Sequence, residues 1–172
     1  VEKRLPCGVN ISCITAGSGW PGYPTQVTVD LYTSREGGLS FWGLRVAIVG
    51  EVAYSRVARS NSHALVKLGA EVRVVGPPTM MPCGVDKLGV RVYYNLDEGL
   101  RGVQVIMMLR LQLERQGIAL FPTIREYTRL YGLTTERVKL ADPGAIVMHP
   151  GPINRGVEIA PEVADSLWSV IL

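Results

Sequence analysis

The chain has 172 residues, 47% of them hydrophobic and 19% charged, which suits one α/β domain with a core that needs neither disulfides nor a metal. Its net charge of +3 comes from scattered Lys and Arg residues, and no segment has the apolar length of a membrane span or signal peptide. We therefore predict a cytoplasmic protein that binds neither nucleic acid nor membranes. The three cysteines lack C-x-x-C spacing, so a disulfide framework or a zinc site is not expected.

Apolar strands alternate with helices from residue 44 onward. Region 1–43 is rich in Gly, Pro, Ser and Thr and is predicted to be a connector with a first helix over 25–36. Strands are predicted at 44–50, 71–78, 90–95, 103–110 and 145–149, and the first of them is unbroken and β-branched. Helical segments are predicted at 55–70, 96–102 and 123–133. This alternation predicts a doubly wound, mostly parallel five-stranded sheet with helices on both faces, formed by residues 44–172.

Two of the predicted helices carry an apolar face. Helix 55–70 ends at Gly69, and its apolar positions are Val57, Ala58, Ala64, Leu65 and Leu68. Helix 123–133 has its apolar positions at Ile124, Tyr127, Leu130 and Tyr131. The last residues, "WSVIL", show no closing helix, and residues 1–43 are too few and too polar to bury a second core.

Polar side chains follow three of the predicted strands. Arg56 comes after the first strand, Arg110 and Gln112 follow the fourth, and His149 with a proline–glycine–proline turn follows the fifth. Ligands bind outside the carboxyl ends of strands in open α/β sheets. Because arginine forks grip carboxylates and a helix N-terminus favours anions, these residues predict a site for a small dicarboxylate or a phosphorylated metabolite.

The turn after the fifth strand is rigid. Pro150 and Pro152 fix φ and lack backbone donors, so the carbonyls of this turn could be held toward a ligand amine. Each polar residue also has an ordinary explanation: Arg56 could lie on the helix surface, and His149 could cap a strand end by bonding a neighbouring carbonyl. Three further residues are better explained as structural, exposed or paired groups: His63, Arg59 and Arg155. The G-x-G-x-x-G and P-loop motifs are absent, which argues against a nucleotide cofactor.

Long stretches of the chain resemble one enzyme family. They are "AGSGWPGYPTQ…DLYT", "GLRVAIVGEVAYSRVARSN…ALVKLGAEVRVVGPPTMMP", "MMLRLQLER", "REYTRLYGLT" and "AIVMHPGPINRGVEI". From about residue 10 onward, the chain is similar to the C-terminal, aspartate-binding half of aspartate carbamoyltransferase catalytic chains. Ornithine carbamoyltransferases share the fold but carry His-Cys-Leu-Pro where this chain has His149-Pro150-Gly151-Pro152.

The resemblance implies transfer of a carbamoyl group from carbamoyl phosphate to the amino group of L-aspartate, in pyrimidine biosynthesis, without metal or organic cofactor. It implies that Arg56 and Arg110 hold the aspartate carboxylates with help from Gln112. The residues implied to face the carbamoyl group are Gln26, Pro150, Gly151 and Pro152. The intact enzyme would be a homotrimer, with a regulatory or complementary chain as a further partner.

Several family features have no counterpart in this sequence. The phosphate-binding Ser-Thr-Arg-Thr motif and the lysine loop belong to an N-terminal carbamoyl phosphate domain that we expect to be absent here. Tyr23 stands where the family has a histidine that polarises the carbamoyl carbonyl. We therefore expect weak or no activity from the isolated chain. A non-catalytic paralogue that binds a dicarboxylate or assembles with complete chains is the alternative.

Overall fold

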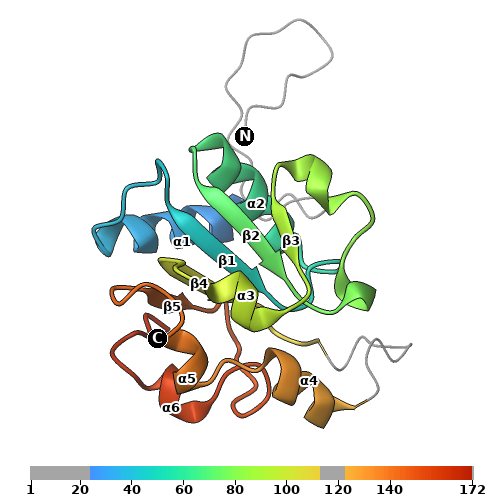
Figure 1. Cartoon of the computed structure of the whole chain (residues 1–172). Coiled ribbons are helices and arrows are strands. Elements are labelled where there is room, and N and C mark those ends of the chain that lie inside the picture. Colours follow the sequence, from blue (N-terminus) through green and yellow to red (C-terminus); the bar gives the residue numbers. More distant parts are fainter. Residues whose placement is uncertain (1–23, 113–122, 172) are drawn as a thin grey trace, which may run out of the picture.

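The computed structural model describes residues 24–112 and 123–171, which form one parallel β-sheet with helices on both faces (Figure 1). The strands are β1 (Arg45–Val49), β2 (Glu71–Val75), β3 (Arg91–Tyr93), β4 (Val105–Met108) and β5 (Ile146–Met148). Their order is β3-β2-β1-β4-β5, and every pairing is parallel. The predicted doubly wound sheet of five strands is therefore confirmed.

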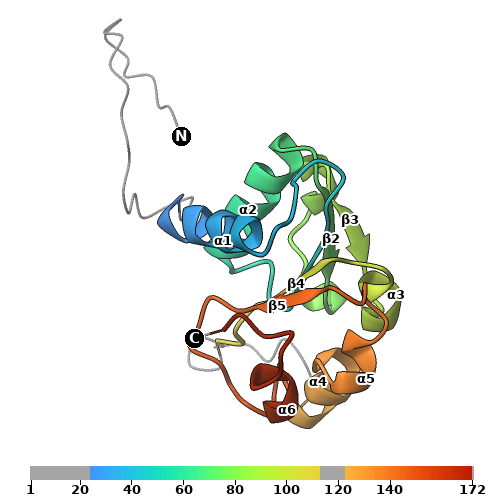
Figure 2. The same cartoon turned by 90° about the vertical axis from the view of Figure 1, so that its left-hand side faces the viewer.

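The helices are divided between the two faces of this sheet (Figure 2). They are α1 (Pro24–Glu36), α2 (Arg56–Lys67), α3 (Leu96–Leu100), α4 (Ile124–Tyr131), α5 (Thr135–Val138) and α6 (Pro161–Ala164). Helices α1 and α2 cover one face, and α3 to α6 cover the other. The sequence did not predict α5, α6 or the 3₁₀ turns Pro78–Met80 and Val85–Leu88, because segments of three or four residues show no helical period.

The central strands explain the unbroken apolar runs of the sequence. Successive side chains of a strand point to opposite faces, and both faces of this sheet are covered. Ile48 and Met107 pack under α1 and α2, whereas Val49 and Met108 pack under the helices of the other face. All four side chains are buried, so no polar alternation was available to mark a solvent-facing side.

Helix α2 begins and ends where the sequence indicated, but its buried face differs from the prediction. Ser55 caps the helix by accepting a hydrogen bond from the Ala58 N–H at 3.1 Å, and Gly69 adopts a positive φ just beyond its end. Leu68 is 41% exposed. The buried positions of α2 are Ala58, Asn61, Ser62 and Leu65. Two polar residues thus lie on the face toward the sheet, where only apolar ones were expected.

The predicted apolar face of α4 is also narrower than expected. Tyr127 and Tyr131 are buried and stack with ring centroids 5.5 Å apart. Ile124 and Leu130 are 43% and 48% exposed. Positions three or four residues apart share a helix face only approximately. Since α4 lies at the margin of the domain, only the line through its two tyrosines reaches the core (Figure 1).

The strand order determines where a ligand could bind. From β1 the chain proceeds outward through β2 and β3, and then returns to the other side of β1 with β4 and β5. The carboxyl ends of β1 and β4 therefore lie at the point where the order reverses, where open α/β sheets bind their ligands. Among the described residues no helix is long and apolar enough to cross a membrane, and no group of His, Cys, Asp and Glu is placed to hold a metal ion.

Candidate active site

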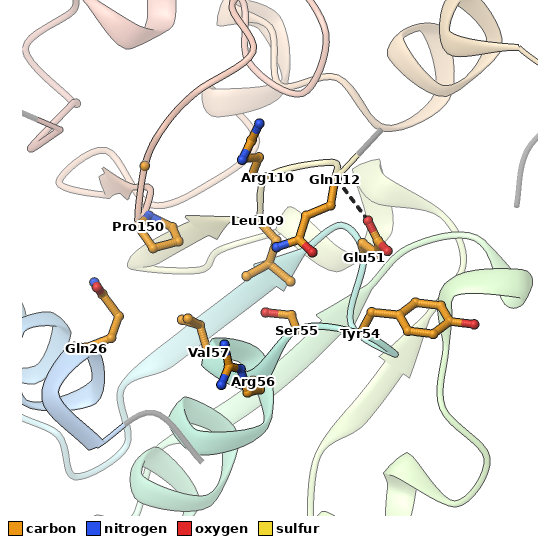
Figure 3. A pocket seen from close by; sticks show the side chains of 11 residues that line it. Gln26, Glu51, Tyr54, Ser55, Arg56, Val57, Leu109, Arg110, Gln112 and Pro150 are labelled. Carbon is orange, nitrogen blue, oxygen red and sulfur yellow. Dashed lines mark hydrogen bonds between the residues drawn. The ribbon is translucent and has the colours of Figure 1, made fainter. Parts of the chain in front are cut away.

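A cavity of about 250 Å³ lies at the carboxyl ends of β1, β4 and β5 (Figure 3). Its lining residues are Gln26, Glu51, Tyr54, Ser55, Arg56, Val57, Leu109, Arg110, Gln112, Pro150 and Gly151. Six of the predicted site residues are among them. Pro152 is exposed and does not line the cavity, and Tyr23 falls outside the described residues. The three strand ends that the sequence marked as polar thus meet around one space.

The segment between β1 and the start of α2 contributes several of the residues that line the cavity. Arg56 is the first residue of α2, and Ser55 immediately before it caps the helix, so the N-terminal end of α2 faces the cavity. The unpaired N–H groups and dipole of such a helix end favour an anion. Glu51 is buried, at 4% exposure, and also lines the cavity. The site therefore combines two arginines with one buried acid.

Glu51 anchors the segment after β4. Its Oε2 accepts a hydrogen bond from the backbone N–H of Gln112 at 3.2 Å, as drawn in Figure 3. Gly50 permits the close approach of the two segments: its φ is +126°, and a Cβ there would lie 3.1 Å from the Cβ of Leu109. Arg110 and Gln112 are consequently held beside the β1 end, with both side chains toward the cavity.

A buried histidine contacts the turn after β5. His149 Nδ1 accepts a hydrogen bond from the Gly151 N–H at 2.9 Å, so the ring proton resides on Nε2. Nε2 lies 3.3 Å from Glu158 Oε1, and both side chains are fully buried. Gly151 has a φ of +61°, a conformation that favours glycine. The histidine thus meets an N–H and a carboxylate rather than the backbone carbonyl that a strand-end cap would satisfy.

Glu158 joins this turn to the β4 segment. Its Oε1 also accepts a hydrogen bond from the Asn154 backbone N–H at 2.6 Å, and the Asn154 side chain donates to the Leu111 carbonyl at 3.1 Å. Leu111 stands between the two cavity residues of the β4 segment.

Burial, and then the nearby charges of Glu158 and Glu51, raise the pKa of Tyr127 far above its usual range, so its phenol stays neutral.

The remaining wall comes from α1. Gln26 lines the cavity on the same side as Pro150 (Figure 3), and its Nε2 donates to Asp30 Oδ1 at 2.9 Å. Asp30 is 6% exposed and accepts a second hydrogen bond, from Asn61 Nδ2 to Oδ2, at 2.6 Å. Desolvation raises the pKa of Asp30, and the hydrogen bonds from Asn61 and Gln26 partly offset that rise.

Other polar residues singled out in the sequence lie away from the cavity lining. His63 is exposed on α2, and Arg155 forms a bidentate pair with Asp165 at 2.6 and 2.9 Å. Sequence reasoning missed Glu51 and Tyr54 as cavity residues, although both stand in the segment that joins β1 to α2. Position directly after a buried strand was the signal that could have found them.

Comparison with known proteins shows the family of this chain. A family model described as aspartate/ornithine carbamoyltransferase, Asp/Orn binding domain, matches residues 42–172. The chain belongs to this family. Aspartate carbamoyltransferase catalytic subunits from Moorella thermoacetica and Endomicrobium trichonymphae are 56% and 52% identical to it, over 95% and 97% of the chain. The chain spans about half the length of these curated relatives, at 53% and 54%.

A solved carbamoyltransferase shares the fold. The crystal structure of aspartate transcarbamoylase from Trypanosoma cruzi in complex with carbamoyl phosphate superposes with a TM-score of 0.74 at 26% identity. The superposition covers 87% of this chain and 50% of that one. The chain is therefore a carbamoyltransferase amino-acid-binding domain in which the predicted carboxylate-binding residues line one cavity.

Proposed function

We propose that this chain forms the aspartate half of an aspartate carbamoyltransferase active site, which transfers a carbamoyl group from carbamoyl phosphate to the amino group of L-aspartate. The observation that carries the proposal is the convergence of Arg56, Arg110 and Gln112 on one cavity, facing Gln26 and the Pro150–Gly151 turn. The names of these two curated relatives support aspartate over ornithine as the acceptor.

In this proposal the arginines bind the two carboxylates of aspartate. Each guanidinium offers paired donors in a plane, which matches a carboxylate bidentately, and Gln112 adds a directional hydrogen bond. The N-terminal end of α2 adds positive potential beside Arg56. Two cationic side chains on neighbouring strand ends suit a dicarboxylate better than a diamino acid, whose side-chain ammonium they would repel.

The carbamoyl group would lie between α1 and the β5 turn. Gln26 and the backbone of Pro150 and Gly151 would contact it, while the clamped aspartate directs its amine at the carbamoyl carbon. The amine lone pair forms the new C–N bond, phosphate leaves with the electrons of the C–O bond, and the proton lost by the attacking nitrogen goes to the departing phosphate. Catalysis here is orientation of the two reactants plus stabilisation of the charge that develops on the tetrahedral intermediate.

The phosphate group of the donor would need residues beyond those described. The family binds it with a Ser-Thr-Arg-Thr motif that this sequence lacks, and Tyr23 stands in the place of the family's histidine. We therefore expect the isolated chain to be weakly active or inactive. The working enzyme would be a cytoplasmic homotrimer that includes the other half of the catalytic chain, with a regulatory or complementary chain as a candidate partner.

Ligand binding tests the carboxylate clamp directly. Isothermal titration of succinate or L-aspartate into the chain should give saturable binding that Arg110→Ala weakens at least tenfold, a loss of about 1.4 kcal/mol. Arg91→Ala is the matched control because it removes the same charge at the opposite end of the sheet, where Arg91 pairs with Glu71. A change below about threefold for Arg110→Ala, or equal losses in both variants, would refute the assignment.

Complementation distinguishes the enzyme from the alternative, a binding paralogue. The tyrosine at position 23 favours that alternative. Carbamoyl-aspartate formation is measured with the chain alone and with a separately produced carbamoyl phosphate domain of a relative. A rate that appears on mixing and disappears with Arg56→Ala supports the enzyme. Silence after mixing, from a chain that still binds succinate, supports the paralogue.

A further inference from the structure

The amide of Gln26 has a fixed partner on its own helix. Gln26 and Asp30 are one helical turn apart on α1, and Nε2 of the glutamine donates to Oδ1 of the aspartate at 2.9 Å. The glutamine also lines the cavity, on the same side as Pro150 (Figure 3). One side of the amide therefore faces a buried carboxylate, and the other side faces the space where a ligand would bind.

Asp30 itself is held by a second helix. Its Oδ2 accepts a hydrogen bond from Asn61 Nδ2 at 2.6 Å, and Asn61 is fully buried on α2. An ionised carboxylate only accepts hydrogen bonds, so each amide must turn its nitrogen toward it. Within the part of the chain that the structure describes, Gln26 Oε1 accepts no hydrogen bond.

From this geometry we infer that Asp30 is a positioning residue that orients the Gln26 amide with its carbonyl oxygen toward the cavity. That wall of the cavity then accepts a hydrogen bond, and it selects a ligand group that bears an N–H donor, such as a primary amide. The inference rests on the proposed function, because the amide of carbamoyl phosphate would be the group selected. With the opposite orientation, the NH₂ group of Gln26 would face the N–H donors of the ligand, and no hydrogen bond could form between them.

A structural role alone would also explain part of the cluster. Asp30 joins α1 to α2 through Asn61, and the Ser34 hydroxyl donates to the Asp30 carbonyl at 2.9 Å. Ser34 is equally buried, at 4% exposure, and its hydroxyl also lies 3.6 Å from the Met148 sulfur. It has no contact with the Gln26 amide, so Ser34→Ala disturbs the same helix without touching the proposed orientation.

Kinetics of the complemented enzyme distinguish the two roles. Asp30→Asn keeps the shape of the side chain but leaves only one acceptor oxygen for two amide donors. Because the bond from the fully buried Asn61 is the shorter one, at 2.6 Å against 2.9 Å, we expect the oxygen to stay with Asn61, so that the new NH₂ group faces Gln26 and reverses the glutamine. We expect the KM for carbamoyl phosphate to rise about tenfold, as for one lost hydrogen bond, with the KM for aspartate within about twofold. Ser34→Ala should change neither constant. Equal effects of Asp30→Asn on both constants, or no effect on either, would overturn the inference.

A second variant covers the case in which Asp30→Asn does not fold. Gln26 is half-buried, so Gln26→Met removes the amide at nearly constant size. It should reproduce the rise in the KM for carbamoyl phosphate, and an unchanged constant would overturn the inference. An inactive wild-type mixture would refute the proposed function instead.

Amide NMR then tests the orientation by itself. The side-chain NH₂ resonances of Gln26, assigned by their loss in Gln26→Met, should move in Asp30→Asn and remain in place in Ser34→Ala. Resonances that stay in place in Asp30→Asn would overturn the inference whether or not the enzyme is active.

Discussion

Two buried carboxylates support the cavity from opposite faces of the sheet, and their surroundings differ. Asp30, on the face covered by α1 and α2, has each oxygen paired with one amide nitrogen. Glu158, on the other face, concentrates its contacts on Oε1, which meets His149 and the Asn154 backbone, while Oε2 has no hydrogen-bond partner among the described residues. Asp30 thus orients a side chain, whereas Glu158 holds the backbone of two segments.

This difference predicts that Glu158 matters more for stability and Asp30 more for ligand recognition. Glu158 is the residue that ties the turn after β5 to the segment after β4, through its contacts with Asn154 and His149 and the bond from Asn154 to Leu111. The α1–α2 pair, in contrast, also packs through apolar side chains such as Leu31 and Leu65. The following substitutions test that contrast, beginning with the largest expected effect.

Glu158→Ala should be the most destabilising change. It leaves the Asn154 N–H without its acceptor and removes the carboxylate beside the buried His149 ring, which we expect to lower the free energy of unfolding by about 3 kcal/mol. Urea denaturation monitored by circular dichroism measures the loss. Glu158→Gln keeps an acceptor oxygen at the same place and should cost about 1 kcal/mol. Equal losses in the two variants would show that the carboxylate contacts contribute nothing specific.

His149→Ala should come next, with a loss of about 2 kcal/mol, because the Gly151 N–H and Glu158 Oε1 each lose a buried partner. If the two side chains act as one unit, the double variant with Glu158→Ala should be less destabilised than the sum by about 1 kcal/mol or more. His63→Ala, at an exposed position of α2, is the control and should stay within about 0.5 kcal/mol of wild type. If the losses of unfolding free energy in the two single variants simply add up in the double variant, the histidine and the glutamate act independently.

The sequence predicted the elements of this architecture better than its polar clusters. Mainly apolar runs marked all five strands, and strand ends pointed to Arg56, Arg110 and Gln112. The partner of Asp30 on α2 could not be foreseen, because Asn61 is distant in sequence and occupies a position where an apolar residue was expected. The contact between His149 and Glu158 depends on how the segment after β5 turns back, which no local period encodes. The strand order likewise follows from packing rather than from local pattern.

Asn61→Ala should cost about 1.5 kcal/mol, less than either change in the Glu158 cluster. It removes one of the two amide donors to Asp30, but the apolar contacts of α2 with the sheet remain. Thermal and urea unfolding measure the loss, with Ser62→Ala as the control from the next buried position of the helix. A loss larger than that of Glu158→Ala would reverse the proposed ranking of the two carboxylates.

The smallest effect, and the most specific to Asp30, is a change in pH dependence. Because burial raises the folded-state pKa above 3.8, the ordinary value, the folded chain binds this proton more tightly than the unfolded chain. The resulting stabilisation is fully present below pH 3.8 and is lost as the pH rises through the folded-state pKa. The unfolding free energy of wild type relative to Asp30→Asn should therefore fall between pH 3.8 and neutrality.

Asn61→Ala sharpens this test, because the Asn61 hydrogen bond lowers the pKa of Asp30 and its removal should extend the fall to higher pH. Urea denaturation of the three proteins at matched pH values gives the comparison. A difference between wild type and Asp30→Asn that rises with pH would mean that the two amide donors outweigh burial. In that case the hydrogen bonds from Gln26 and Asn61 would dominate the pKa of Asp30. Asp30 would then differ from Glu158 in its hydrogen-bond partners rather than in its desolvation.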